Sequence, residues 1–284
     1  TLDGTLFPYT TLFRSYCDDR HFALLNRDPK SRIVSHAEAV SVCDRGGIDY
    51  MVCMGFAWFS PGYCAAQNEY FARISRETGG RLIPFGSVPL DEPKNTGSWV
   101  REIKSMGLKG VGEIAFYGDG MTAGNIDYLD SVLGEAGALS LPVCIHVNEP
   151  VGHRYPGKYE PELRTLYQVI ERHRDVTMIL SHWGGGLFVY ELMPEVKERL
   201  SNCYYDTAAT PYLYREEIYS AALNILGERK ILFGSDYPLI GPGKYVKAVT
   251  ETVLDAGARA GILAATPPGY SGCDDITCFL SGLS

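Results

Sequence analysis

The sequence predicts an α/β fold, a (β/α)8 or TIM barrel that lacks its native first strand. From Ile33 onward, short apolar or β-branched runs alternate with helix-like segments, which is the pattern of a parallel sheet with crossover helices. Seven such runs are found where a barrel needs eight. An open doubly wound sheet would usually show a Gly-rich phosphate-binding turn after its first strand, and the sequence contains no such motif.

The predicted strands are short and apolar, as expected for strands that are buried on both faces. They are Asp49–Met54, Leu82–Val88, Gly110–Ile114, Pro142–Val147, Thr177–Ser181, Cys203–Asp206 and Lys230–Gly234. The segments between them have apolar residues near helical spacing. Helices are therefore predicted at Gln67–Thr78, Trp99–Met106, Asn125–Ala136, Pro161–Arg174, Leu192–Leu200, Glu216–Leu226 and Gly243–Ala256.

The two ends of the chain do not continue this pattern. Residues 1–15 end in TLFPYTTLFRS, which matches the translation of a short-read sequencing adapter, so we expect an assembly artefact there. After Ala256 the helical pattern gives way to Gly, Pro, Cys and Ser, and we expect residues 257–284 to be a frameshifted tail. Residues 16–256 then form one barrel domain.

Composition limits the class of protein. A chain of 284 residues with 45% hydrophobic residues can bury one large core. The net charge of −8 and the lack of a Lys/Arg run argue against a nucleic-acid partner. The eight cysteines are scattered singly, which favours a reducing cytoplasm. The longest apolar runs are far below the ~20 residues that cross a bilayer, and no signal peptide is found, so we expect a soluble protein without membrane contact.

Polar side chains follow four of the predicted strands, where a barrel gathers its catalytic groups. These residues are Glu113, His146, His182 and Asp236. Two neutral imidazoles and a carboxylate suit a divalent ion, with one position left open for water. Each histidine alone is equally compatible with a hydrogen-bonded core residue. Their joint occurrence after successive strands favours a metal site.

Three segments resemble the motifs of a known family. VCIHVNEP, MILSHWGGG and ILFGSDYPLIGP are similar to the strand-five, strand-six and strand-eight motifs of the amidohydrolase-related family, and the resemblance spans roughly residues 33–254. That family includes aminocarboxymuconate-semialdehyde decarboxylase, resorcylate-type decarboxylases and dicarboxylate lactonases. The resemblance implies that His146 and His182 bind metal. It also implies that Asp236 contacts the metal and handles the proton of the metal-bound water.

The resemblance also leaves questions about the ligand set. Glu113 falls where some relatives place a ligand that bridges two metals; alternatively, its carboxylate orients loops. The family's first strand should supply two more ligands in a His-x-His pair, but His21 and His36 lie outside any such pair. We therefore expect weakened metal affinity and impaired activity for this chain, with an active natural parent. Zn²⁺ is the expected ion, with Mn²⁺, Fe²⁺ and Mg²⁺ as alternatives.

Five residues near these motifs are predicted to contact substrate: Tyr117, His153, Arg154, Trp183 and Tyr237. Arg154 lies in the loop NEPVGHRYPGKY, where a guanidinium can clamp a substrate carboxylate. Its alternative is a solvated loop arginine. His153 is equally interpretable as a loop residue, and Trp183 as a core residue.

The leading functional hypothesis is a hydrolase of a C–N or C–O bond in a small substrate that can carry a carboxylate. A divalent metal lowers the pKa of bound water toward ~7, and Asp236 takes its proton. The alternative is a non-oxidative decarboxylase of an aromatic or unsaturated acid, in which Asp236 or His182 protonates carbon. A second alternative is an inactive ligand-binding barrel. The substrate is a small molecule in each case. Self-association is compatible with such a barrel, although no sequence feature fixes an oligomeric state.

Overall fold

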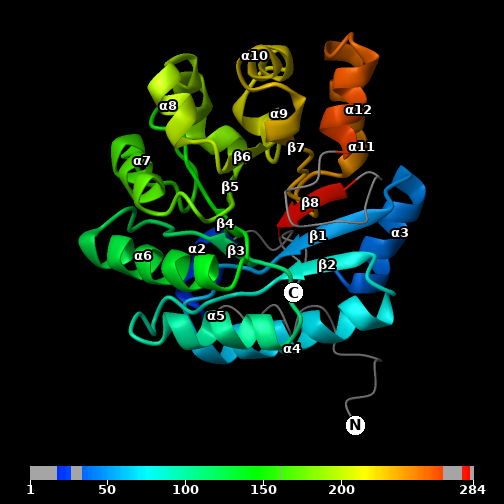
Figure 1. The fold of residues 1–284 in the computed structure, drawn as a ribbon. Helices are drawn as coiled ribbons and strands as arrows, with labels where there is room; N and C mark the ends of the chain where they lie inside the picture. Colours follow the sequence, from blue (N-terminus) through cyan, green and yellow to red (C-terminus); the bar gives the residue numbers. More distant parts are fainter. Residues whose placement is uncertain (1–17, 27–33, 161, 265–276, 282–284) are drawn as a thin grey trace.

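The strands of the computed structural model form two parallel sheets. The structure describes residues 18–26, 34–160, 162–264 and 277–281. One sheet has the order β3 (Val111–Ile114), β4 (Val143–Ile145), β5 (Met178–Leu180), β6 (Cys203–Asp206) and β7 (Ile231–Leu232). The other has the order β2 (Leu82–Phe85), β1 (Tyr50–Met54) and β8 (Thr277–Ser281). A parallel bridge between Gly86 and Val111 connects β2 to β3, so β1 to β7 follow one another in sequence order (Figure 1).

Each of the seven predicted strands overlaps an observed one, but the barrel does not close in the described structure. The eighth strand is β8, which pairs in parallel with β1 from Tyr50 opposite Thr277 to Met54 opposite Ser281. This strand lies in the segment predicted to be a frameshifted tail. It is therefore not the missing first strand, which was expected to precede β1 in the sequence. The adapter-like residues 1–15 lie outside the described residues, and both predictions about the chain ends stay predictions.

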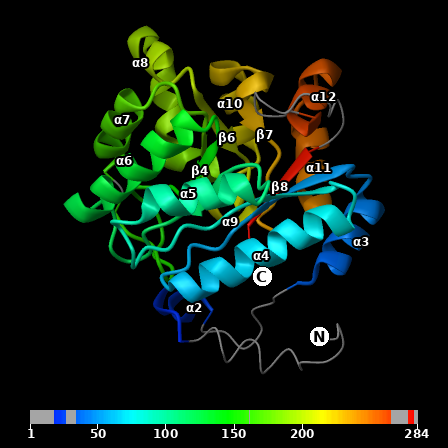
Figure 2. The same ribbon diagram turned by 60° about the horizontal axis from the view of Figure 1, so that its bottom comes forward.

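Helices surround the strands (Figures 1 and 2). They are α2 (Arg20–Leu25), α3 (His36–Gly46), α4 (Pro61–Glu77), α5 (Thr96–Ser105), α6 (Ala123–Ala138), α7 (Leu163–Arg172), η1 (His182–Leu192), α8 (Pro194–Arg199), α9 (Thr210–Leu213), α10 (Glu217–Leu226), η2 (Glu228–Lys230), α11 (Pro242–Thr252) and α12 (Ala256–Ala264). The helix α12 lies beyond the predicted end of helical pattern and buries Ile262. None of the described helices has the length and apolar character that a membrane span requires.

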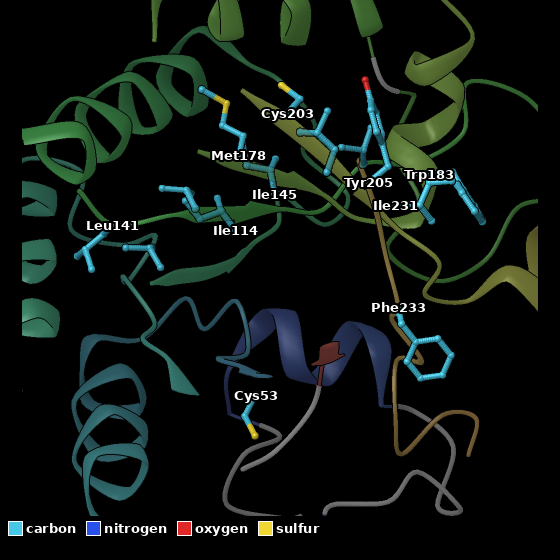
Figure 3. Packing of buried hydrophobic residues seen from close by; sticks show 14 of the residues in the cluster. Cys53, Ile114, Leu141, Ile145, Met178, Trp183, Cys203, Tyr205, Ile231 and Phe233 are labelled. Carbon is cyan, nitrogen blue, oxygen red and sulfur yellow. The ribbon is translucent and has the colours of Figure 1, made fainter. Parts of the chain in front are cut away.

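The strand residues alternate between two cores, because successive side chains of a strand point to opposite faces. In β4, Cys144 packs into a small cluster with Val52, Phe85 and Ile179, which forms the interior of the strand layer. The alternate residues of the strands, such as Ile145, Met178 and Ile231, belong to the large core shared with the helices (Figure 3). The polar residues at the strand ends are therefore next to the apolar cluster that fills the interior of the strand layer.

Candidate metal centre

Three buried side chains converge at the carboxyl ends of β3, β4 and β5. The Nδ1 atom of His146 lies 3.0 Å from Oε1 of Glu113 and 3.1 Å from Nε2 of His182. The third side of this triangle, from His182 Nε2 to Glu113 Oε1, is 3.7 Å. Among the described residues, this is the group of histidine, cysteine and acidic side chains whose atoms are placed to hold one metal ion.

The spacing and chemistry of this group fit a divalent cation. Ligand atoms bound at ~2.0–2.2 Å to one ion, at tetrahedral or octahedral angles, are ~2.8–3.6 Å apart. The three separations in the triangle lie at or near this range. Two imidazole nitrogens and one carboxylate oxygen suit Zn²⁺, Mn²⁺ or Fe²⁺. The residues present therefore fit the metal that the sequence predicts, with Glu113 as a member of the group.

The electrostatics of the group also favour a cation. Burial alone would raise the pKa of Glu113, but the neighbouring His146 and His182 outweigh burial and lower it. Burial would lower the pKa of His182, whereas the charges of Glu113, Asp206 and Asp236 raise it to about 9. The carboxylates thus hold a proton on His182 when no other positive charge is present. A divalent ion would provide that charge.

Neighbouring groups hold the two histidine rings in place. Nδ1 of His182 lies 3.2 Å from the carbonyl oxygen of Ala208, so Nε2 is the nitrogen that faces Glu113. The amide of Asn148 lies 2.8 Å from Nε2 of His146, and its own Oδ1 accepts a hydrogen bond of 3.1 Å from the Tyr159 backbone. Contacts of this kind fix the orientation of a metal-binding imidazole.

Asp236 lies beside the group but outside it. Its carboxylate is not among the atoms that lie within 4.8 Å of one another. Burial raises the pKa of Asp236 to about 7; the positive charge of His182 opposes this shift, and the carboxylates of Glu113 and Asp206 add to it. Glu113, His146 and His182, three of the four predicted ligands, therefore form the group, and Asp236 is a neighbouring carboxyl group. A contact between Asp236 and the metal stays a prediction.

Of the residues predicted to contact substrate, Tyr117 is the one that contacts the group. Its ring meets that of His146 edge-on, with 5.0 Å between centroids. Burial, together with the charges of Glu113 and Asp236, raises the pKa of Tyr117 well above its usual value. Its hydroxyl therefore keeps its proton at neutral pH and is a hydrogen-bond donor beside the site.

The other four predicted substrate residues are placed elsewhere. Trp183 is completely buried and donates a 2.8 Å hydrogen bond to Thr210, so it is a core residue. The side chain of Arg154 is 85% exposed and pairs with Glu160, which agrees with the alternative interpretation of Arg154 as a solvated loop residue. His153 is also exposed. The hydroxyl of Tyr237 donates to Glu38 of α3 at 3.0 Å, which directs it toward that helix.

His21, which lies outside any His-x-His pair, is nevertheless held near the site. Asp19 caps α2 by accepting from the backbones of His21 and Phe22, and its other oxygen accepts from the backbone of Phe59 at 2.8 Å. The ring of His21 lies 5.4 Å from that of Tyr117, and its buried Nε2 has no hydrogen-bond partner in the described structure. The Asp-rich start of the segment was the signal for this helix cap.

The parallel strands with their surrounding helices and the buried Glu–His–His group are typical of metal-dependent enzymes with a TIM-barrel-like α/β fold. A family model described as amidohydrolase matches residues 21–267. The chain therefore belongs to the amidohydrolase family, and the resemblance noted in the sequence is confirmed.

Individual relatives are distant in sequence. The chain is 23% identical to 2-amino-3-carboxymuconate-6-semialdehyde decarboxylase from Dictyostelium discoideum over 65% of its length, and it spans 60% of the length of that relative. It resembles the structure of 2,6-dihydroxybenzoate decarboxylase from Rhizobium, with a TM-score of 0.64, 17% identity and coverage of 90% of this chain and 92% of that one. It also resembles 5-carboxyvanillate decarboxylase from Novosphingobium aromaticivorans, with a TM-score of 0.64, 15% identity and coverage of 91% and 89%.

These structural likenesses show a shared TIM-barrel-like fold. The Novosphingobium structure contains manganese and 4-hydroxy-3-methoxy-5-nitrobenzoic acid. Together with the Glu113–His146–His182 group, this supports a divalent metal for the family fold. Zinc stays a prediction.

Proposed function

We propose that this protein is a metal-dependent, non-oxidative decarboxylase of a small aromatic or unsaturated carboxylic acid. The decisive feature is the buried group of Glu113, His146 and His182 at the ends of three neighbouring strands, with Asp236 beside it. The decarboxylases among the relatives favour this reaction over the hydrolysis that the sequence placed first. The ligand set by itself is compatible with both reactions.

Glu113, His146 and His182 would hold the divalent ion. When bound, such an ion supplies positive charge that orients a substrate carboxylate and stabilises negative charge on a neighbouring oxygen. Tyr117 lies against His146 and keeps its proton, so it can donate a hydrogen bond to a substrate oxygen. These residues bind and orient the acid.

Asp236 provides the proton that decarboxylation requires. The bond between the carboxylate carbon and the neighbouring carbon breaks, carbon dioxide leaves, and the electron pair stays on the neighbouring carbon. Asp236 gives its proton to that carbon and becomes a carboxylate, which solvent then reprotonates. In the metal-free protein, burial raises the pKa of Asp236 to about 7, and a carboxyl group that titrates near neutral pH can both give and regain a proton. The reaction consumes no oxidant or reductant.

The test uses the Mn²⁺-loaded protein and 2,6-dihydroxybenzoate labelled with ¹³C in its carboxylate, in D₂O. We expect ¹³CO₂ by mass spectrometry and one deuterium on the carbon that carried the carboxylate. Asp236→Asn should lower the rate at least ~100-fold, since a positioned proton donor contributes about that much. Asp130→Asn, which changes a carboxylate on the outer surface of α6, is the matched control and should keep the rate.

Hydrolysis gives a different result. A hydrolase would leave the labelled acids intact and would release an acid and an alcohol or amine from a lactone, ester or amide. The release of those products without carbon dioxide would overturn the proposal and restore the hydrolase hypothesis. A panel that includes 5-carboxyvanillate and simple dicarboxylate lactones separates the two outcomes.

A further inference from the structure

A turn at the end of β6, residues Asp206–Thr210, contacts the ends of the strands on both sides of it. We propose that this β6 turn is a positioning device that fixes His182 and Asp236 relative to each other. Among its five residues, none was assigned a role from the sequence. The inference rests on the proposed function only because His182 and Asp236 belong to the proposed site.

On the β5 side, the turn holds both the backbone and the ring of His182. The Oδ1 atom of the buried Asp206 accepts a hydrogen bond of 2.9 Å from the His182 backbone N–H. The same oxygen accepts one of 3.0 Å from the backbone of Ala208, whose carbonyl oxygen lies 3.2 Å from His182 Nδ1. The Nε2 atom of His182 is thereby left to face Glu113.

On the β7 side, Thr207 holds the strand end that leads to Asp236. Its Oγ1 donates to the carbonyl oxygen of Gly234 at 2.7 Å and accepts from the Gly234 N–H at 3.0 Å. The two segments are also in close contact, because a Cβ atom on Gly234 would lie 3.1 Å from Cβ of Asp206. The position of Asp236, two residues further on, depends on this contact.

Non-glycine residues with positive φ angles cluster around the same turn. In the described chain, the non-glycine residues with positive φ are Ser140, His182, Trp183, Ala209 and Asp236. All but Ser140 belong to the β6 turn or to the strand ends that it contacts. Such conformations are unfavourable for L-residues and persist where surrounding contacts enforce them, often at functional sites. The hydrogen bonds of the β6 turn provide that enforcement.

The test compares Asp206→Ala with Asp206→Asn in the full chain, with hydrogen exchange measured on the apo protein. We expect exchange in the peptide covering residues 178–186 to speed up at least tenfold in the alanine variant. The asparagine variant keeps an acceptor oxygen and should stay within about threefold of the wild type. Mn²⁺ affinity, measured by calorimetry, should fall ~10- to 100-fold in the alanine variant, as for other groups that orient metal ligands.

Glu191 provides the matched control. It is a buried carboxylate that also contacts β6, accepting from Tyr205 at 2.8 Å and from Lys230 at 2.6 Å, but it has no contact with His182. Glu191→Ala should disturb those partners and leave both the 178–186 exchange and the Mn²⁺ affinity unchanged. An equal effect of Glu191→Ala, or no effect of Asp206→Ala, would overturn the inference.

A second variant keeps the test decisive if Asp206→Ala does not fold. Thr207→Val removes the hydroxyl that pairs with Gly234 and preserves the side-chain shape. Exchange should then rise in the peptide covering residues 233–238 and not in the peptide 178–186, and Thr207→Ser should restore protection. Unchanged exchange at 233–238 would reject the role of the turn. If the wild type binds no Mn²⁺, the metal centre and the proposed function fail, while the exchange data still decide on the β6 turn.

Discussion

The two sheets of this protein end in different ways. Strands of the five-stranded sheet end near the buried side chains of the candidate metal group, among them Glu113 and His146. The strands β1 and β2 of the three-stranded sheet are followed by Gly55 and Gly86, where a Cβ atom would lie 2.1 Å from Ser87 and 2.5 Å from Ile103. The comparison shows that one sheet carries the candidate metal group, whereas the strand ends of the other are tightly packed.

We call each sheet with its surrounding helices one half of the molecule. The two halves meet at the candidate metal centre. The backbone N–H of Glu113 donates a 2.8 Å hydrogen bond to the carbonyl oxygen of Gly55 at the end of β1. The three-stranded sheet therefore supports the backbone of a candidate ligand without contributing a side chain to the described group. Changes in the two halves should have separable effects on metal affinity and on stability.

The largest expected effect is the loss of metal binding when a ligand is removed. His182→Ala should lower the affinity for Zn²⁺ or Mn²⁺ at least ~1,000-fold, which is ~4 kcal/mol. His36→Ala is the control, since His36 lies in α3 beside the other sheet and contacts Tyr70. Competition with a fluorescent chelator measures both. Equal losses in the two variants would remove the basis for assigning the metal to the five-stranded sheet.

A cavity in the half with the three-stranded sheet should lower stability and leave metal affinity unchanged. Ile74 of α4 is fully buried in the core, and Ile74→Ala should destabilise the protein by about 3 kcal/mol through lost burial and the cavity left behind. Metal affinity should stay within threefold, because Ile74 has no contact with the ligand group. Urea unfolding of the apo protein gives the stability, and chelator competition gives the affinity. A strong loss of affinity would show that the halves are coupled.

Metal removal should destabilise one half more than the other. At a free metal concentration of 100 times Kd, binding contributes about 2.7 kcal/mol to stability. Stripping the metal with a chelator should remove this contribution and lower Tm. Hydrogen exchange should speed up mainly at the ends of β4 and β5, with little change in β1 and β2. Uniform acceleration across both sheets would contradict the proposed location of the ion.

The strands were predictable because a buried parallel strand leaves a continuous apolar run in the sequence. The positions of His146 and His182 followed from those runs. Side chains in loops and turns were not predictable in this way. The bond from Tyr237 to Glu38 joins residues 199 positions apart, and the solvated pair of Arg154 depends on the path of a long loop. Sequence spacing does not encode such contacts.

The role of Asp206 was missed for a related reason. It was included as the last residue of the predicted strand Cys203–Asp206 and was given no role. Its partner is the backbone N–H of His182, and every residue has such a group, so no motif marks the contact. The pairing of β8 with β1 was equally hidden, because residues 257–284 show no strand pattern that stands out from a loop.

The smallest expected effect compares ion pairs on the outer surface of the two halves. Burial would raise the pKa of Asp130 in α6, but hydrogen bonds from Arg172 and His173 outweigh burial and lower it. A folded-state pKa below the unfolded value of ~3.9 means that this carboxylate stabilises the protein above that pH, and that its contribution is lost as pH falls through the folded-state pKa. Because the pair is partly exposed, Asp130→Asn should cost up to ~1 kcal/mol at pH 7. This cost should shrink as pH falls below ~3.9 and through the folded-state pKa.

The matched pair beside the three-stranded sheet is Asp44 with Arg81, at 2.8 Å and with 59% of the Asp44 side chain exposed. Asp44→Asn should change stability by less than about 0.5 kcal/mol at any pH, since a single exposed ion pair is screened by water and salt. Urea midpoints at pH 7, 5, 4 and 3 measure both variants. If Asp130→Asn were equally neutral at pH 7, this ion pair would not stabilise the five-stranded half, and the comparison would rest on the strand ends of the two halves and not on these surface pairs.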